Sequence, residues 1–223
     1  MSVRGRGRRM DIREIIVIMT TFQDKHIAVR KALPGDAKNF ADLMLLSSPT
    51  LFPTIYGDEV KSVMQYLFRK RRNLFSFEHT YFAELDGRKA GMIVEYDWRT
   101  KRRENWRTGF LLLMQMRLGL LTKLPLLMKV EDVIGMVGDK ESYISNVAVY
   151  PEFRVTGLGS RLIFEVEGKA KKNGAEKVAL EVEVENAGAI RLYERLGYSI
   201  VSESEVILTG GKSFHFYRMC KEL

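Results

Sequence analysis

The spacing of apolar residues along the chain predicts an α/β fold. Apolar residues at every second position predict strands, and apolar residues three or four positions apart predict helices. By this criterion the strands cover 26–32, 80–85, 90–96, 143–149, 177–185, 198–202 and 214–219. The helices cover 59–72, 157–173 and 187–196, and a further helix follows Asp36. Strands and helices in this order are typical of an α/β domain.

Two local signals sharpen this assignment. Asp86 and Gly87 stand between two apolar runs, which is a strong signal for a hairpin between the second and third strands. Asp36 is predicted to cap the first helix, because its side chain can accept hydrogen bonds from free helix N–H groups. The apolar face of that helix is predicted to carry Phe40, Leu43 and Met44.

Residues 97–140 fit no sheet pattern and are predicted to form an insertion. Its segment 110–128 is very apolar but contains Gln115, Arg117, Lys123 and Pro125. A membrane-spanning helix needs about 20 mostly apolar residues, so we expect no membrane span. We interpret the segment as a helical lid or an oligomer contact, which is compatible with a homodimer. A role at a membrane surface is the second interpretation.

Length and composition indicate one domain with an insertion. The chain has 223 residues, of which 46% are hydrophobic, and we assign 1–25 to a basic extension and 26–223 to the domain. The single cysteine, Cys220, excludes an internal disulfide framework and fits a reducing compartment. The short apolar stretch 15–19 is a poor signal peptide. We therefore expect a cytoplasmic protein.

The formal net charge of +8 admits an anionic partner. The basic residues form separate clusters that are not interleaved with aromatic side chains, as single-strand binding surfaces are. We therefore expect no nucleic acid, although a basic N-terminal arm keeps that interpretation open. A cofactor rich in phosphate explains the charge equally well.

A glycine-containing loop carries the strongest functional signal. The strand 143–149 stops at Pro151, Arg154 follows, and Gly157 and Gly159 open a helix. Glycine has no Cβ, so an oxyanion can approach the backbone closely. The free N–H groups and the dipole of a helix N-terminus favour that anion. The glycines could also serve only to permit a turn, and the spacing alone does not decide between the two interpretations.

Two familiar nucleotide-binding motifs are excluded. A Walker loop needs Gly-Lys-Ser/Thr, whereas Gly159 is followed by Ser160 and Arg161. A dinucleotide fingerprint needs a third glycine at position 162, which is leucine.

The loop resembles the Arg/Gln-x-x-Gly-x-Gly/Ala signature of the GCN5-related N-acetyltransferase (GNAT) superfamily. Arg154, Gly157 and Gly159 match it, together with the preceding Val-x-Pro. A second match follows at the spacing of that family and comprises Leu180-Glu181-Val182, Asn186, Ala189 and the run from Leu192 to Tyr198. This second motif is similar to that of protein N-terminal alanine acetyltransferases. The resemblance covers 26–221 and is specific over 143–200.

The resemblance implies a fold and a cosubstrate. The fold is a mixed, largely antiparallel twisted sheet of about six to seven strands flanked by helices, with the helical insertion between the third and fourth strands. The cosubstrate is acetyl-CoA, and no metal is expected. Its pantetheine arm would pair with Val147 and Val149 and contact Asn186. Its pyrophosphate would lie on the backbone amides of Arg154, Val155, Thr156, Gly157, Leu158, Gly159 and Ser160.

The catalytic residues are assigned on the same basis. Tyr193 is expected to protonate the leaving thiolate, although it could be only a core residue of an amphipathic helix. Glu181 is expected to be the general base, although it could be a solvated strand carboxylate, and Glu95 is a second candidate. An α-amine has a pKa of roughly 7.7–8.0 and a lysine of roughly 10.4, so an α-amine demands less of a base.

The leading hypothesis is an N-acetyltransferase that acts on a small primary amine or a protein N-terminus by direct attack on the thioester. One alternative is an acyltransferase for a longer acyl donor or an apolar acceptor. Another is a non-catalytic CoA-binding sensor. The acceptor itself is not encoded in any motif that we can identify.

Overall fold

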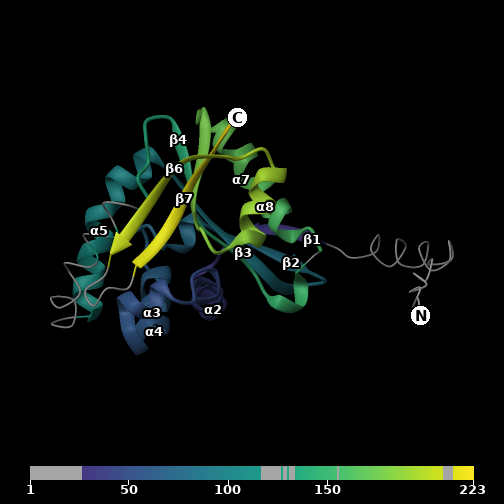
Figure 1. The fold of residues 1–223 in the computed structure, drawn as a ribbon. Helices are drawn as coiled ribbons and strands as arrows, with labels where there is room; N and C mark the ends of the chain where they lie inside the picture. The colour runs from purple at the N-terminus through teal and green to yellow at the C-terminus, as the bar shows by residue number, and fades with distance from the viewer. Residues whose placement is uncertain (1–26, 117–126, 128–129, 131–133, 155, 208–212) are drawn as a thin grey trace, which may run out of the picture.

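A seven-stranded sheet forms the centre of the computed structural model, which describes residues 27–116, 127, 130, 134–154, 156–207 and 213–223 (Figure 1). The strands are β1 (Ile27–Lys31), β2 (Thr80–Leu85), β3 (Arg88–Asp97), β4 (Glu141–Val149), β5 (Lys177–Glu183), β6 (Ser199–Ile207) and β7 (Ser213–Glu222). Their order in the sheet is β1-β2-β3-β4-β5-β7-β6. Among the described strands only β4 and β5 pair in parallel, so the predicted mixed, largely antiparallel sheet is confirmed.

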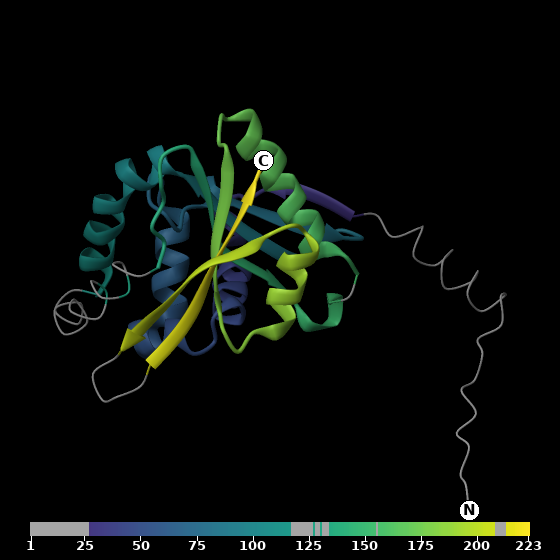
Figure 2. The ribbon, with the colours of Figure 1, turned by 45° about the horizontal axis from the view of Figure 1, so that its top comes forward.

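Helices cover both faces of this sheet (Figures 1 and 2). They are α2 (Ala37–Ser47), α3 (Leu51–Tyr56), α4 (Val60–Arg69), α5 (Trp98–Met116), α7 (Leu158–Lys172) and α8 (Ala187–Arg195). Short 3-10 turns are η1 (Pro34–Asp36), η2 (Gly57–Glu59), η3 (Phe77–His79) and η4 (Pro151–Phe153). The helices α2, α3, α4 and α5 lie on one face, and α7 and α8 lie on the other.

Each face of the sheet has its own apolar core. The core under α2–α5 includes Phe40, Phe68 and Phe82, which are fully buried. The core under α7 and α8 includes Leu162 and Ile163 from the buried face of α7. A site between β4 and β5 can therefore be walled from either side by well-packed residues.

The hairpin between β2 and β3 is confirmed. Asp86 and Gly87 form its two-residue loop and have φ angles of +51° and +76°. Positive φ at both central residues is what a type I′ turn requires, and its twist matches that of the flanking strands.

The predicted cap of the first helix is wrong in its chemistry. Asp36 stands at the N-cap of α2, but its side chain makes no hydrogen bond to the helix. The carboxylate instead accepts hydrogen bonds from Arg30 and from the backbone N–H of Leu33 and forms an ion pair with Lys89. Asp36 therefore ties β1 and the hairpin to the start of α2.

The insertion begins with a helix directly after β3. α5 extends from Trp98 to Met116 and includes only the first part of the apolar segment 110–128. The helix α3 was not predicted. The extension 1–25 and most of the remaining apolar segment lie outside the described residues.

Candidate active site

The sheet opens between β4 and β5. Their parallel pairing ends at Ile144 and Leu180, although β4 continues to Val149 and β5 to Glu183. On its other edge β4 stays paired with β3 up to Val149, with an irregular register around Ser145. The edge of β4 that faces the opening therefore has no strand partner among the described residues beyond Ile144.

This edge of β4 presents backbone amides to the opening. The N–H of Tyr150 donates to the carbonyl of Ala90 next to β3, at 2.9 Å. Successive amides of a strand point to opposite edges, so the N–H groups of Val149 and Val147 point toward the opening. An extended ligand could hydrogen-bond there as an additional strand does.

The start of α7 has the geometry of an anion site. Gly157 is its N-cap and has a left-handed φ of +80°, and the space where a Cβ would stand is open. The first turn of a helix leaves its N–H groups without intrahelical acceptors and carries a partial positive charge. These residues fit a pyrophosphate, because its oxygens can reach the amides without a side chain in the way.

Gly159 lies within ordinary contact distance of α8. A Cβ at Gly159 would stand 3.4 Å from Cδ2 of Leu192 in α8. The close packing of these two helix segments places the start of α7 beside the helix that carries Tyr193. The loop and the predicted catalytic tyrosine are therefore neighbours.

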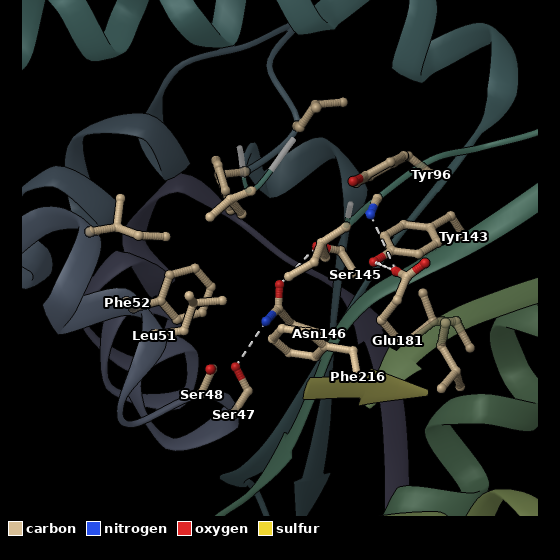
Figure 3. A pocket seen from close by; sticks show the side chains of 18 of the residues that line it. Ser47, Ser48, Leu51, Phe52, Tyr96, Tyr143, Ser145, Asn146, Glu181 and Phe216 are labelled. Carbon is tan, nitrogen blue, oxygen red and sulfur yellow. Dashed lines mark hydrogen bonds between the residues drawn. The ribbon is translucent and has the colours of Figure 1, made fainter. Parts of the chain in front are cut away.

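A cavity of about 540 Å³ passes through the opening in the sheet (Figure 3). Its lining includes Val182 and Tyr193 from the core under α7 and α8, and Phe52 and Leu112 from the core on the opposite face. Val147 of β4 also lines it. The opening thus joins the two faces of the sheet in one binding space.

The side chain of Glu181 is buried in the wall of this cavity beside Tyr143 (Figure 3) and is held by three donors. Its side chain is only 3% exposed. It accepts hydrogen bonds from the Tyr143 hydroxyl, from Arg218 and from the backbone N–H of Gly135 in the insertion. The interpretation of Glu181 as a solvated strand carboxylate is therefore wrong. A carboxylate offers about four lone-pair positions, so this one retains acceptor capacity.

Arg218 and Tyr143 hold this carboxylate in position. Arg218 of β7 bridges Glu181 and the buried Glu141, and Lys177 is a second cation 3.9 Å from Glu141. Burial and the negative charge of Glu181 raise the pKa of Tyr143 well above its usual value. The phenol therefore stays protonated and donates to Glu181.

The second candidate base, Glu95, has a different environment. Its carboxylate accepts hydrogen bonds from Ser142 at 2.6 Å and from Lys169 of α7 at 2.8 Å. Its side chain is 3% exposed and is not part of the cavity lining. Glu95 is a structural ion-pair partner of α7, so its geometry does not support a role as base.

Tyr193 and Asn186 approach the cavity from α8. Burial raises the pKa of Tyr193 to about 12, so its phenol is a proton donor at neutral pH. Its ring packs against Tyr198 at a centroid distance of 5.9 Å. Asn186 caps α8 by accepting a hydrogen bond from the N–H of Ala189 through its side-chain oxygen, which leaves its amide nitrogen to face a ligand.

The structure thus brings together four of the predicted site residues. Val147, Glu181, Asn186 and Tyr193 line one cavity. Outside that lining lie the remaining predicted residues, which are Val149, Arg154, Thr156, Gly157, Leu158, Gly159 and Ser160; Val155 is outside the described residues.

Three residues of the site were not predicted. Tyr143 and Gly135 lie in segments without a chemical motif. Arg218 gave one signal, because it is a charged residue within a predicted strand that is otherwise largely apolar, and a buried charge requires a partner.

The described residues contain neither a candidate metal site nor a helix that could span a membrane. No group of three or more His, Cys, Asp or Glu side chains there could hold a metal ion. No helix in the same part of the chain is long and apolar enough to cross a membrane.

The opening in the sheet leads into a cavity lined by Glu181 and Tyr193, and α7 begins beside the helix that carries Tyr193. The family model of the acetyltransferase (GNAT) family matches residues 48–198. The chain belongs to the GNAT family.

Curated relatives match part of this chain. It is 39% identical over 72 residues to the uncharacterized N-acetyltransferase YobR of Bacillus subtilis. The aligned residues are 31% of this chain and 29% of YobR. It is 39% identical over 59 residues to the [ribosomal protein bS18]-alanine N-acetyltransferase of Escherichia coli. The aligned residues are 26% of this chain and 40% of that enzyme. These matches span well under two thirds of the relatives' own lengths.

Solved structures share the whole fold. An N-acetyltransferase from Staphylococcus aureus Mu50 aligns with a TM-score of 0.65 at 16% identity, covering 87% of this chain and all of that one. The structure of yncA from Salmonella typhimurium, solved with its cofactor acetyl-CoA, aligns with a TM-score of 0.57 at 17% identity. The alignment covers 88% of this chain and 94% of yncA. At such identities the likeness concerns the fold.

Proposed function

We propose that this chain transfers the acetyl group of acetyl-CoA to a primary amine, either a small amine or a protein N-terminus, by direct attack on the thioester. The observation that carries the proposal is the opening between β4 and β5. It brings Tyr193 and Glu181 into one cavity beside the amide-bearing edge of β4 at Val147. Family membership and the acetyl-CoA complex of a structural relative support the same cosubstrate.

The residues divide the reaction between them. The backbone amides at the start of α7 bind the pyrophosphate, and the edge of β4 pairs with the pantetheine arm. An N–H of Val147 or Val149 donates to the oxyanion that develops on the thioester carbonyl. These contacts hold the carbonyl carbon within reach of the acceptor amine.

Protons move at two residues. The neutral amine forms the new C–N bond, and Glu181 accepts the proton that the nitrogen then releases. As the C–S bond breaks, Tyr193 donates its proton to the sulfur and is reprotonated from solvent. Tyr143 and Arg218 keep the Glu181 carboxylate in place while it changes charge.

Two acceptor classes agree with this chemistry. The similarity to the bS18-alanine N-acetyltransferase favours a protein N-terminus, whose α-amine needs little help to lose a proton. The size of the cavity favours a small amine that enters it completely. The proposal therefore includes both a protein N-terminus and a small amine as acceptors.

The test is release of the CoA thiol from acetyl-CoA in the presence of primary amines, followed with a thiol reagent. The matched controls are the N,N-dimethyl derivatives, which cannot form a neutral amide. Thiol release with primary amines only, together with the acetylated product by mass spectrometry, is the expected result. CoA binding without turnover on any amine would contradict the proposal and support the sensor alternative.

A further inference from the structure

We infer that the acceptor is an amphiphilic primary amine, with its nitrogen at Glu181 and an apolar body in the part of the cavity between α3 and the insertion. This inference rests on the proposed function and narrows its acceptor. We call that part of the cavity the acceptor chamber. Its walls are Leu51, Phe52 and Ile55 of α3, Leu112 of α5, and Leu127 and Val130 of the insertion.

The walls of the chamber are apolar on two opposite sides. α3 buries Leu51, Phe52 and Ile55, each less than 10% exposed, and Leu112 of α5 is 6% exposed. These side chains belong to one packed core, so the chamber has fixed walls. A cavity of this volume lies within the range of pockets that enclose small-molecule ligands, roughly 300–1,000 Å³.

Outside the chamber the cavity is lined by two carboxylate residues and by Lys101. Glu181 and Glu183 both line the cavity, and Ser48 donates a hydrogen bond to Glu183 at 2.9 Å. A cationic ammonium group is stabilised beside carboxylates in a site of low polarity. The cavity therefore matches a molecule that has one amine and one apolar end.

This arrangement favours an amine over a long acyl chain. An acyl chain that entered the chamber would lie against the Glu181 carboxylate without donating a hydrogen bond to its remaining acceptor position. An amine with an apolar body satisfies both the carboxylate and the apolar walls. The family motif at Arg154–Ser160 has no part in this choice, because those residues lie outside the cavity lining.

The test is a series of acceptors with the same amino group and a growing apolar body: methylamine, propylamine, hexylamine and 2-phenylethylamine. Each methylene that enters the chamber should raise kcat/KM roughly fourfold. Spermidine and a tripeptide with N-terminal alanine serve as polar acceptors, and octanoyl-CoA replaces acetyl-CoA in a parallel arm.

Variants of the chamber wall test where the apolar body of the amine binds. Leu112→Phe should lower the ratio of kcat/KM for hexylamine to that for methylamine at least tenfold. Met114→Phe is the matched control, because Met114 is 58% exposed on the same helix and lies outside the cavity lining. If Leu112→Phe does not fold, Phe52→Ala should move the preference toward a longer amine.

The outcomes separate the inference from the function on which it rests. A rise of kcat/KM with apolar size that Leu112→Phe reverses supports the inference. The inference is overturned if all amines are used equally, if spermidine or the peptide is preferred, or if octanoyl-CoA gives better turnover. In each of these cases the release of thiol would still support acyl transfer. No turnover with any acceptor overturns both.

Discussion

The hydroxyl of Tyr143 in β4 donates a hydrogen bond to the carboxylate of Glu181 in β5, next to the point where these two strands separate. Tyr143 still belongs to the paired part of β4, whereas Glu181 is the first residue of β5 beyond the pairing. The contact therefore fixes a carboxylate at the edge of the opening through which the cavity passes.

Glu181→Gln should lower kcat by about 10²–10⁴-fold, because the amide cannot accept the proton from the amine. The loss should be largest at neutral pH and smaller at high pH, where more of the amine is already neutral. A pH–rate profile measures this. Glu185→Gln is the matched control, since Glu185 is exposed in the turn that follows the same strand. An unaltered profile for Glu181→Gln would move the base to water.

Tyr193→Phe should reduce kcat at least tenfold while the Kd for CoA changes little, because the hydroxyl acts only when the thiolate leaves. Tyr198→Phe makes the same chemical change in the neighbouring ring, which lies outside the cavity lining, and should keep its activity. Since the pKa of Tyr193 is raised to about 12, its ionisation should not limit kcat below about pH 10. Normal turnover of Tyr193→Phe would remove it from the mechanism.

Arg218→Gln should destabilise the fold by about 3 kcal/mol, because it removes the cation of the buried Glu181 carboxylate and the closer of the two cations at Glu141. Urea denaturation measures this change. Arg102→Gln is the comparison, since Arg102 pairs with Asp139 on the surface, where both side chains are at least 70% exposed, and such pairs contribute little. Equal stability of the two variants would contradict the role of Arg218.

Asp36 should make the free energy of unfolding depend on pH in the acidic range. Burial would raise the pKa of Asp36, but hydrogen bonds from Arg30 and from the backbone of Leu33 outweigh burial and lower the pKa to about 2. Because the pKa of Asp36 is lower in the folded state, its carboxylate stabilises the fold at pH values above the unfolded pKa of 3.8. This stabilisation is lost as the pH falls toward 2. Asp36→Asn should remove about 2 kcal/mol at pH 6 and almost nothing near pH 2.

The matched control for this acid dependence is Asp42→Asn. Asp42 pairs with Lys61, whose side chain is 58% exposed, so that variant should change stability little at either pH. Urea denaturation at the two pH values measures both variants. An equal loss for Asp36→Asn at both pH values would show that its contribution is not electrostatic.

The sequence predicted the parts of the fold that are determined locally. The alternation in β4, the Asp86–Gly87 turn and the glycine at the start of α7 each depend on neighbouring residues, and each is found where expected. Glu181 and Tyr193 were predicted through the resemblance, and the structure places both in one cavity.

The remaining features depend on contacts between distant segments. Arg218 meets Glu181 because β5 and β7 pair in a register that places these residues opposite each other, and no local pattern encodes that register. Glu95 resembled a candidate base until its pairing with Lys169 was visible. The six-residue helix α3 was missed because so short a segment shows too little periodicity.

We propose that the start of α7 binds the pyrophosphate of CoA, and calorimetry with Gly157→Glu is the decisive measurement. Gly174→Glu is the matched control, because Gly174 follows the other end of α7 with a φ of +83° and equally open space, whereas Gly157 has +80°. The two variants share the backbone strain and the added charge. We predict that Gly157→Glu weakens CoA binding at least 100-fold and that Gly174→Glu binds CoA like the unmodified protein. Equal CoA affinity of the two variants would contradict the account.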